Sequence, residues 1–264
     1  MKVKRILLTG DDGYNSIGIR LLAHFLKPKY ELLIAATQVQ QSGVGGMLSI
    51  KHGGNWGKTK VDGVDAYWVS GSPGDAMELI KSLGLPSFDL ALSGINLGPN
   101  LIGDLASGTM TAAVRAIKLK LSPKSIAFSW NAPASFWYHD HAGDEDISKY
   151  YDFPGSAAFK LINLAIAQEF WGNFMLNVNF PDQPSNQVKF TRFAYYFDDF
   201  FTQLEVDKTN HKYSYPAGFK AAISGFANTD ADALRSGFIS VTPCKPDLLN
   251  DAVFQALKGQ VVEL

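Results

Sequence analysis

Near its start the chain reads Arg5-Ile6-Leu7-Leu8-Thr9-Gly10-Asp11-Asp12-Gly13, an apolar run followed by an acidic loop between glycines. A short apolar run that ends at a glycine is typical of a buried strand. Residues 16–27 then place apolar side chains at helical spacing and stop before Pro28. Together, the strand, the loop and the helix predict the beginning of a βαβ unit.

The same alternation of short apolar runs and helical patterns continues along the chain, which predicts a parallel sheet covered by helices. Residues 188–228 differ, because they are rich in aromatic and β-branched side chains and predict hairpins. We therefore expect residues 1–264 to form a single α/β domain. It should be Rossmann-like, with three αβα layers, a mostly parallel sheet and a C-terminal β-hairpin extension at about 188–228. Further strands are predicted at 31–36, 61–69, 88–93, 125–129, 174–179 and 238–242, helices at 76–83, 107–120, 154–170 and 248–257, and hairpins at 188–201 and 213–226.

Composition limits the possible partners and the compartment. The 264 residues include 24 basic and 25 acidic side chains, a net charge of -1, which argues against a binder of duplex nucleic acid or anionic membranes. The single cysteine, Cys244, excludes an intrachain disulfide framework and a multi-cysteine zinc site. We expect Cys244 to be a small buried side chain and the protein to be cytoplasmic.

The adjacent carboxylates of Asp11 and Asp12 are the strongest chemical signal. Two like charges in one short loop favour a bound cation between or beside them. The hydroxyl of Ser42 and the side-chain amide of Asn96 follow other predicted strands and would add oxygen ligands. An all-oxygen set suits Mg²⁺ or Mn²⁺, and also Ca²⁺. The alternative is that Asp11 and Asp12 serve only as turn and capping residues.

A second signal is Ser107-Gly108-Thr109 at the start of a predicted helix. Free backbone N–H groups, two hydroxyls and the positive end of a helix dipole form a site for phosphate. The alternative is an ordinary serine N-cap. The long loop before this helix carries Asn100, a further possible donor to phosphate.

Two other clusters carry less weight. His139-Asp140-His141 with Asp144 has metal-ligand residue types, but the pattern lacks helical spacing, so we expect a solvated polar loop. An aromatic cluster in the hairpin region could stack a nucleobase, but packing within a hairpin or a subunit interface is the favoured interpretation. This cluster consists of Tyr195, Tyr196, Phe197, Phe200 and Phe201.

The order of these loops resembles the SurE family of survival proteins, which are metal-dependent nucleotide and phosphate-monoester phosphatases. The likeness rests on Ile6 to Gly13, Gln41-Ser42-Gly43, Gly71-Ser72-Pro73-Gly74-Asp75, Ser93-Gly94-Ile95-Asn96 with Asn100, and Ser107-Gly108-Thr109. Later landmarks are Leu176 to Pro181 and the segment from Thr229-Asp230 through Gly237 to Pro243.

The resemblance implies one divalent metal ion held by Asp11, Asp12, Ser42 and Asn96. It also implies hydrolysis of a small phosphorylated substrate, most simply a nucleoside 5'-monophosphate, by a metal-activated water that Asp11 or Asp12 orients or deprotonates. The phosphate would be held by Asn100, Ser107, Gly108 and Thr109. A homodimer or homotetramer with exchanged C-terminal arms is expected as well.

Two departures from the family pattern bear on activity. Gly10 stands where the family commonly has asparagine, and Thr37-Gln38-Val39-Gln40 replaces a segment that is often Pro-Asp-Arg-Glu in character. A SurE-like fold with altered or lost catalysis, acting as a nucleotide- or metal-binding protein, therefore stays open. A receiver module, a haloacid-dehalogenase phosphatase and a dinucleotide-binding enzyme fit less well, because their defining aspartate or glycine patterns are missing.

Overall fold

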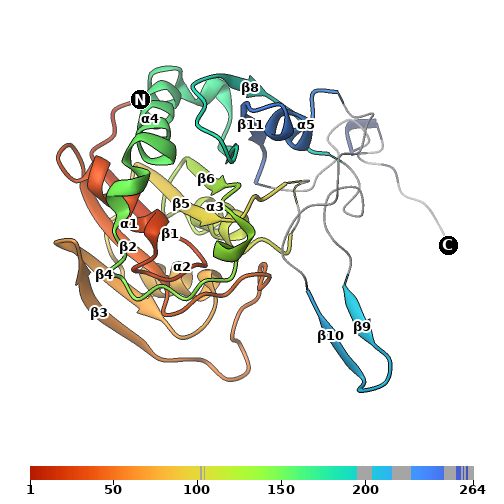
Figure 1. The fold of residues 1–264 in the computed structure, drawn as a ribbon. Coiled ribbons are helices and arrows are strands. Elements are labelled where there is room, and N and C mark those ends of the chain that lie inside the picture. Colours follow the sequence, from red (N-terminus) through yellow and green to blue (C-terminus); the bar gives the residue numbers. More distant parts are fainter. Residues whose placement is uncertain are drawn as a thin grey trace.

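The computed structural model describes residues 1–101, 103, 105–194, 204–215, 227–246, 254–256, 258 and 260 (Figure 1). A nine-stranded sheet with the order β3-β4-β2-β1-β5-β6-β7-β11-β8 runs through its centre. Pairing is parallel from β4 to β7 and between β11 and β8, and antiparallel at β3–β4 and β7–β11. The strands are β1 (Arg5–Thr9), β2 (Glu31–Thr37), β3 (Trp56–Val61), β4 (Val64–Val69), β5 (Leu90–Leu97), β6 (Ser125–Trp130), β7 (Met175–Phe180), β8 (Val188–Phe190) and β11 (Ile239–Cys244).

Helices cover both faces of the sheet and give the three expected layers. Helices α1 (Ile17–Leu26) and α4 (Ser156–Ala167) pack in one core cluster with Ile6 and Leu8, whereas α2 (Pro73–Ser82) and α3 (Gly108–Lys118) pack in another with Leu7. Alternate residues of β1 thus serve opposite faces, as the geometry of a strand requires. The remaining helical segments are α5 (Asp230–Arg235), η1 (Ala134–Phe136), η2 (Ile147–Tyr150), η3 (Tyr151–Gly155) and η4 (Glu169–Gly172).

Two predicted strands are wrong in detail. Residues 61–69 were expected to form one strand, but they belong to the β3–β4 hairpin, which turns at Asp62-Gly63. Both turn residues have positive φ, 47° and 87°, and Asp-Gly is a favoured sequence for such a turn. Residues 188–190 were expected in a hairpin, but β8 joins the central sheet beside β11.

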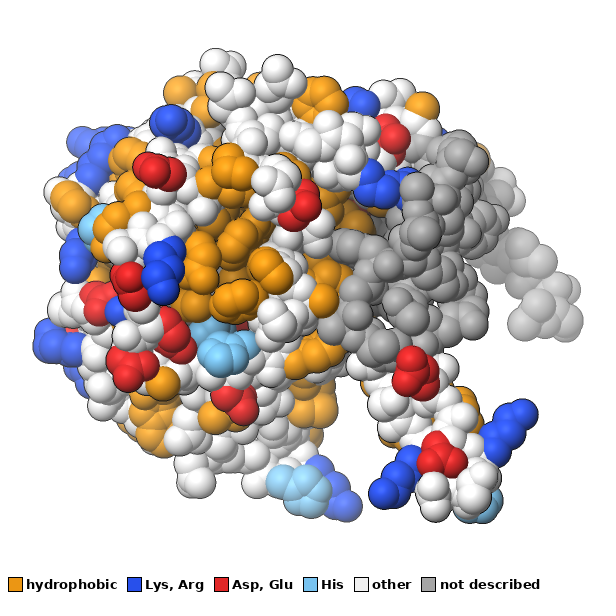
Figure 2. Space-filling view, in the orientation of Figure 1, with side chains coloured by type: hydrophobic (Ala, Val, Ile, Leu, Met, Phe, Trp, Pro, Cys, Tyr) orange, Lys and Arg blue, Asp and Glu red, His pale blue; other side chains and the backbone are white. Residues whose placement is uncertain are grey.

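A separate hairpin, β9 (Glu205–Asp207) with β10 (Lys212–Ser214), extends from the body (Figure 1). All residues of its two strands are exposed, and Val206 and Tyr213 keep 59% and 70% of their surface accessible. Charged side chains surround its tip (Figure 2). A β-hairpin extension was therefore predicted correctly in kind.

Several other predictions fall outside the described residues. These are the aromatic cluster from Tyr195 to Phe201, most of the segment 213–226, and most of the final helix 248–257, of which residues 254–256 are helical. Within the described part of the chain, no helix combines the length and apolar character needed to cross a membrane.

Candidate functional site

The acidic pair lies at the carboxyl end of β1, where the sheet opens toward its loops. Asp11 and Asp12 are 4% and 5% exposed. Thr109 donates its hydroxyl to Asp11 Oδ1, and the Leu97 amide donates to Asp12 Oδ2 at 2.9 Å. The loop after β1, the end of β5 and the start of α3 thus converge at two carboxylates, at the edge of a parallel sheet where ligands bind.

Electrostatics at this pair favour a bound cation. Burial raises the pKa of Asp11, although hydrogen bonds from Thr109 oppose the shift. Burial also raises the pKa of Asp12 well above its usual value, and the charge of Asp11 raises it further. No Lys, Arg or His among the described residues forms an ion pair with either carboxylate. A divalent ion would compensate both charges, because a nearby cation favours the ionised form of a buried carboxyl.

Asn96 offers an unused oxygen beside the pair. Its side-chain nitrogen donates to the Gly98 carbonyl at 2.7 Å, whereas its Oδ1 is buried without a hydrogen-bond partner in the described structure. A buried acceptor without a partner is unfavourable by about 1–3 kcal/mol. Coordination to a cation would remove that penalty, so Asn96 Oδ1 fits the oxygen ligand predicted from the sequence.

Ser42 approaches the pair through its own loop. The Gln41 amide donates to the Asp11 carbonyl at 2.7 Å, which fixes the loop against the acidic segment. The Ser42 hydroxyl accepts from the Gln40 side chain and lies 3.4 Å from the Trp137 carbonyl. Sequence reasoning missed both neighbours: Gln40 was treated only as a departure from the family pattern, and Trp137 carried no signal.

The start of α3 contacts the acidic pair directly. Ser107 is its N-cap and accepts from the Met110 amide at 3.0 Å, as the alternative interpretation stated. Gly108 lies so close to Asp11 that a Cβ would sit 2.7 Å from Asp11 Oδ2. Thr109 directs its hydroxyl to Asp11. The helix start therefore positions the carboxylate, and phosphate binding by these residues stays a prediction.

Asn100 lies beside the carboxyl ends of the next two strands. Its Nδ2 donates to Ser129 Oγ at 2.7 Å, and its backbone carbonyl accepts from the side chains of Asn177 and Asn179 at 2.8 and 3.0 Å. Ser129, Asn177 and Asn179 are fully buried. Their part in fixing this loop was missed, although buried asparagines at alternate positions of a strand are a detectable signal.

The loop Gly71 to Asp75 serves a structural purpose. Ser72 and Asp75 form a capping box at the start of α2. Asp75 also accepts from the Ser49 hydroxyl at 2.7 Å and from the Ser49 amide. Burial acts to raise the pKa of Asp75, but these hydrogen bonds outweigh it and lower the pKa overall. The loop thus anchors residues 47–49 on α2.

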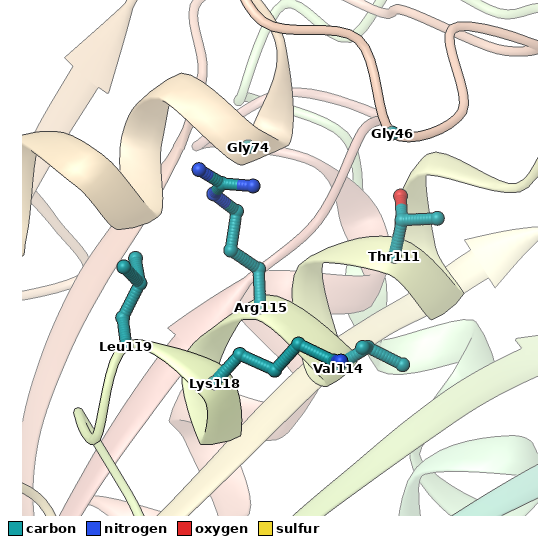
Figure 3. A pocket seen from close by; sticks show the side chains of 7 residues that line it. All are labelled: Gly46, Gly74, Thr111, Val114, Arg115, Lys118 and Leu119. Atoms are coloured by element: carbon teal, nitrogen blue, oxygen red, sulfur yellow. The ribbon is translucent and has the colours of Figure 1, made fainter. Parts of the chain in front are cut away.

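A hollow of about 270 Å³ lies between α2 and α3, next to this anchor, with Gly46 and Gly74 among its lining residues (Figure 3). Arg115 lines it and pairs with Glu78. Neither Asp11 nor Asp12 lines this hollow, so it is distinct from the acidic centre.

Two minor predictions had opposite outcomes. Cys244 is a buried thiol, as expected, and burial raises its pKa to about 12. His141 was expected to be solvated, but its side chain is 1% exposed and contacts Glu145, a residue outside the group named from the sequence. The sequence did not reveal this because a loop's inward residues depend on what it packs against.

Comparisons with known proteins point in one direction. Residues 6–198 match the family model described as "Survival protein SurE". The chain is 34% identical to a "5'-nucleotidase SurE" of Deinococcus radiodurans, with 92% of this chain and 88% of that protein covered, and 31% identical to one of Archaeoglobus fulgidus, with 97% and 96% covered. The crystal structure of the SurE protein from Aquifex aeolicus superposes with a TM-score of 0.71 at 27% identity, covering 96% and 98% of the two chains.

Proposed function

The chain belongs to the SurE family, and from this premise we propose that it is a metal-dependent 5'-nucleotidase that hydrolyses nucleoside 5'-monophosphates. The relatives from Deinococcus radiodurans and Archaeoglobus fulgidus carry the name 5'-nucleotidase SurE. The observation that carries the proposal to this chain is a pair of buried carboxylates that form no ion pair with a described cationic side chain, next to the Asn96 oxygen, which has no hydrogen-bond partner in the same part of the chain.

We assign the metal to Asp11, Asp12, Ser42 and Asn96. Each of these residues presents an oxygen, which suits Mg²⁺ or Mn²⁺ and also accommodates Ca²⁺. Asn96 supports this assignment most directly. Its Nδ2 donates to the Gly98 carbonyl, whereas its Oδ1 has no hydrogen-bond partner among the described residues. When bound, the ion would neutralise phosphoryl charge and acidify a coordinated water.

The chain's own residues divide the remaining work. Asp11 is held by the Thr109 hydroxyl, so its carboxylate is fixed in orientation. Asp12 accepts a hydrogen bond from Leu97 on Oδ2, which leaves Oδ1 to orient the attacking water or to take its proton. Ser107, Gly108 and Asn100 would hold the phosphate from the other side, with Thr109 contributing its backbone.

The test measures phosphate release from AMP, GMP, CMP, UMP and a non-nucleotide monoester. EDTA-treated protein receives Mg²⁺, Mn²⁺ or Ca²⁺ in turn. We expect activity to require added metal and to fall in Asp11→Asn by more than the about 10–100-fold typical of removing an outer-shell partner of a metal site. Asp65→Asn is the matched control, because the Asp65 side chain on β4 keeps 46% of its surface accessible and forms an ion pair only with Lys60 among the described residues.

Full turnover in EDTA together with full turnover in Asp11→Asn would refute the proposal. Metal or nucleotide binding without turnover would instead support the alternative of a SurE-like binding protein that has lost catalysis. Preference for the non-nucleotide ester would keep the phosphatase chemistry and overturn the nucleotide assignment.

We also propose that the protein assembles as a dimer or tetramer through its β-rich extension, about residues 188–228. The exposed β9–β10 hairpin supports this, since an isolated two-stranded hairpin is only marginally stable in water. Packing Val206 and Tyr213 against a second copy would bury their apolar surface.

A further inference from the structure

A second group of metal-ligating side chains lies in the loop between β6 and α4, outside the acidic centre. His139, His141 and Glu145 each bring one ligand atom to within 4.8 Å of the others. The two imidazole rings stand edge to face with their centroids 5.2 Å apart. None of the three is among the oxygen ligands assigned above.

The state of His141 points to a missing partner. Its side chain is 1% exposed, and its Nδ1 lies 3.2 Å from Glu145 Oε1. Its Nε2 is buried and has no hydrogen-bond partner among the described residues. An imidazole that donates Nδ1–H to a carboxylate keeps a bare lone pair on Nε2, which is the arrangement found in metal-bound histidines. Without a bound ion, burying His141 Nε2 with no hydrogen-bond partner would destabilise the fold.

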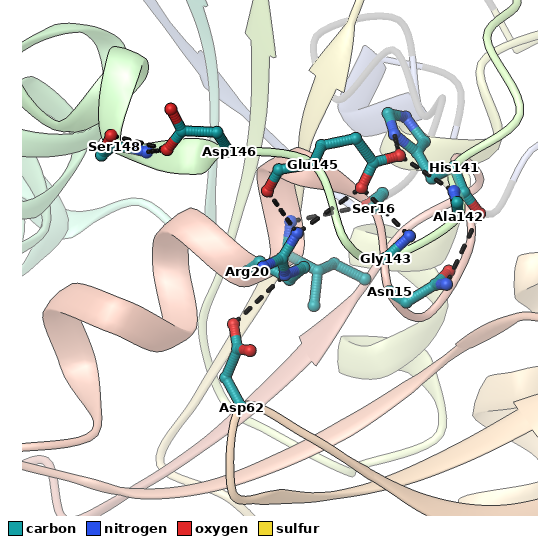
Figure 4. A network of polar contacts seen from close by, with 11 residues as sticks. Asn15, Ser16, Arg20, Asp62, His141, Ala142, Gly143, Glu145, Asp146 and Ser148 are labelled. Atoms are coloured by element: carbon teal, nitrogen blue, oxygen red, sulfur yellow. Dashed lines mark hydrogen bonds and ion pairs between the residues drawn. The ribbon is translucent and has the colours of Figure 1, made fainter.

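Glu145 is fixed by the surrounding loop and by α1 (Figure 4). The amides of Ala142 and Gly143 donate to its carboxylate at 2.9 and 3.0 Å. Arg20 of α1 donates to the Glu145 carbonyl at 2.9 Å and also pairs with Asp62. The carboxylate therefore already has its position and orientation before any ion arrives, as a preorganised site requires.

The loop is also fixed next to the acidic segment. The Asn15 side chain donates to the His141 carbonyl at 3.4 Å. A Cβ on Gly143 would lie 2.6 Å from Asn15 Nδ2, so the two segments are in close contact. An ion bound by this loop would thus restrain the segment that follows the acidic pair.

We propose that His139 and His141, with Glu145 orienting the His141 ring through Nδ1, bind a transition-metal ion of the zinc class, separate from the metal of the acidic centre. Two imidazole nitrogens suit Zn²⁺, and solvent can complete the coordination because His139 is exposed. Mg²⁺ prefers oxygen ligands, so it would not compete effectively here. The ion would fasten the loop to α1 through the Glu145–Arg20 contact.

The test titrates Zn²⁺ into the full chain in excess Mg²⁺, which occupies the acidic centre, and follows binding by calorimetry. We expect one Zn²⁺ per chain and at least a tenfold weaker affinity in His139→Ala and Glu145→Gln. His52→Ala is the matched control, because His52 is exposed in another loop. Co²⁺ in place of Zn²⁺ should give visible absorption that is lost in His139→Ala.

We use His139→Ala and not a His141 variant, because His139 is exposed and its loss should leave the fold intact, whereas the side chain of His141 is buried. Equal Zn²⁺ affinity in wild type and His139→Ala, or Zn²⁺ that Mg²⁺ displaces completely, would overturn the proposal. Both readouts are independent of phosphatase activity, so a failure here leaves the proposed function untouched.

Discussion

Replacing Gly108 with alanine tests whether the start of α3 positions Asp11. Gly108 is buried and is the first residue of the helix. A Cβ at this position would lie 2.7 Å from Asp11 Oδ2, 2.9 Å from Asp11 Cβ and 3.0 Å from Asp11 Cγ. Because Thr109 holds the same carboxylate, Asp11 cannot relax freely and either the carboxylate or the helix must shift.

The distances set the size of the effect. Ordinary contact begins near 3.4 Å, so the Asp11 carboxylate must withdraw by about 0.7 Å. A misplacement of about 1 Å at a catalytic centre can lower the rate about 100-fold, so we expect a loss of about 10–100-fold. Overpacking destabilises by about 1–3 kcal/mol, partly offset by the higher helix propensity of alanine, about 1 kcal/mol. The net loss of stability should be about 0–2 kcal/mol.

The assay combines metal-dependent phosphate release with thermal unfolding of the same samples. Gly10→Ala is the matched control: the change is identical, Gly10 also neighbours Asp11, and a Cβ there would meet nothing closer than 3.5 Å. We expect Gly108→Ala to lose activity while remaining folded, and Gly10→Ala to retain it. Wild-type turnover in folded Gly108→Ala would refute the positioning role, and an equal loss in both variants would show that the distances do not govern activity.

Three further predictions concern the acidic centre and the extension. In metal-free protein at pH 7, Asp12→Asn should be more stable than wild type by about 1–3 kcal/mol, because a buried uncompensated charge is removed. Because the pKa of Asp12 is raised in the folded state, wild type takes up a proton on folding, and the difference in free energy of unfolding between Asp12→Asn and wild type should shrink as pH falls. Urea unfolding in EDTA at several pH values measures this difference. A difference that stays constant or grows as pH falls would contradict the prediction. Gly10→Asn, which introduces the residue common in the family, has room for its Cβ, whose nearest neighbours would lie at 3.5 Å or more, and should lower KM for a nucleotide; an unchanged or higher KM would show that the missing amide does not affect substrate affinity. Tyr213→Glu should shift the assembly toward monomers in sedimentation experiments, and an unchanged distribution would argue against the hairpin as an interface.

Much of the fold was predictable because local pattern and long-range packing agree. The strand at Arg5–Thr9 is observed at its predicted bounds, and the helix expected at 16–27 is observed at Ile17–Leu26. Residues 61–69 were predicted as one strand because most of them are apolar. The Asp62-Gly63 dipeptide is a local turn signal, and it was not used. The sequence pattern did not indicate where β8 pairs. This strand has three residues, and its pairing with β11 depends on which sheet edge lies next to it in the folded chain.

The candidate site was predictable in its residue types and less so in its contacts. Asp11 and Asp12 could be named because they follow a strand that ends at one edge of a parallel sheet, and Asn96 because it lies near the end of β5 at the same edge, although the predicted strand ended at residue 93 and β5 runs to Leu97. The hydrogen bond from Thr109 to Asp11 joins residues 98 positions apart, so it exists only once β1 and α3 are packed together.

The sequence by itself determined the layer architecture and indicated the acidic pair and the oxygen-bearing candidate ligands, because each depends on short-range pattern and residue chemistry. Only the tertiary structure decided that Gly108 abuts Asp11, that Asn96 Oδ1 is buried with no hydrogen-bond partner among the described residues, and that the histidine loop turns His141 inward against Glu145. These features depend on which surfaces meet across the sheet. Burial raises the pKa of Asp12 and encloses His141 Nε2, which has no hydrogen-bond partner among the described residues, and burial is a property of the packed chain.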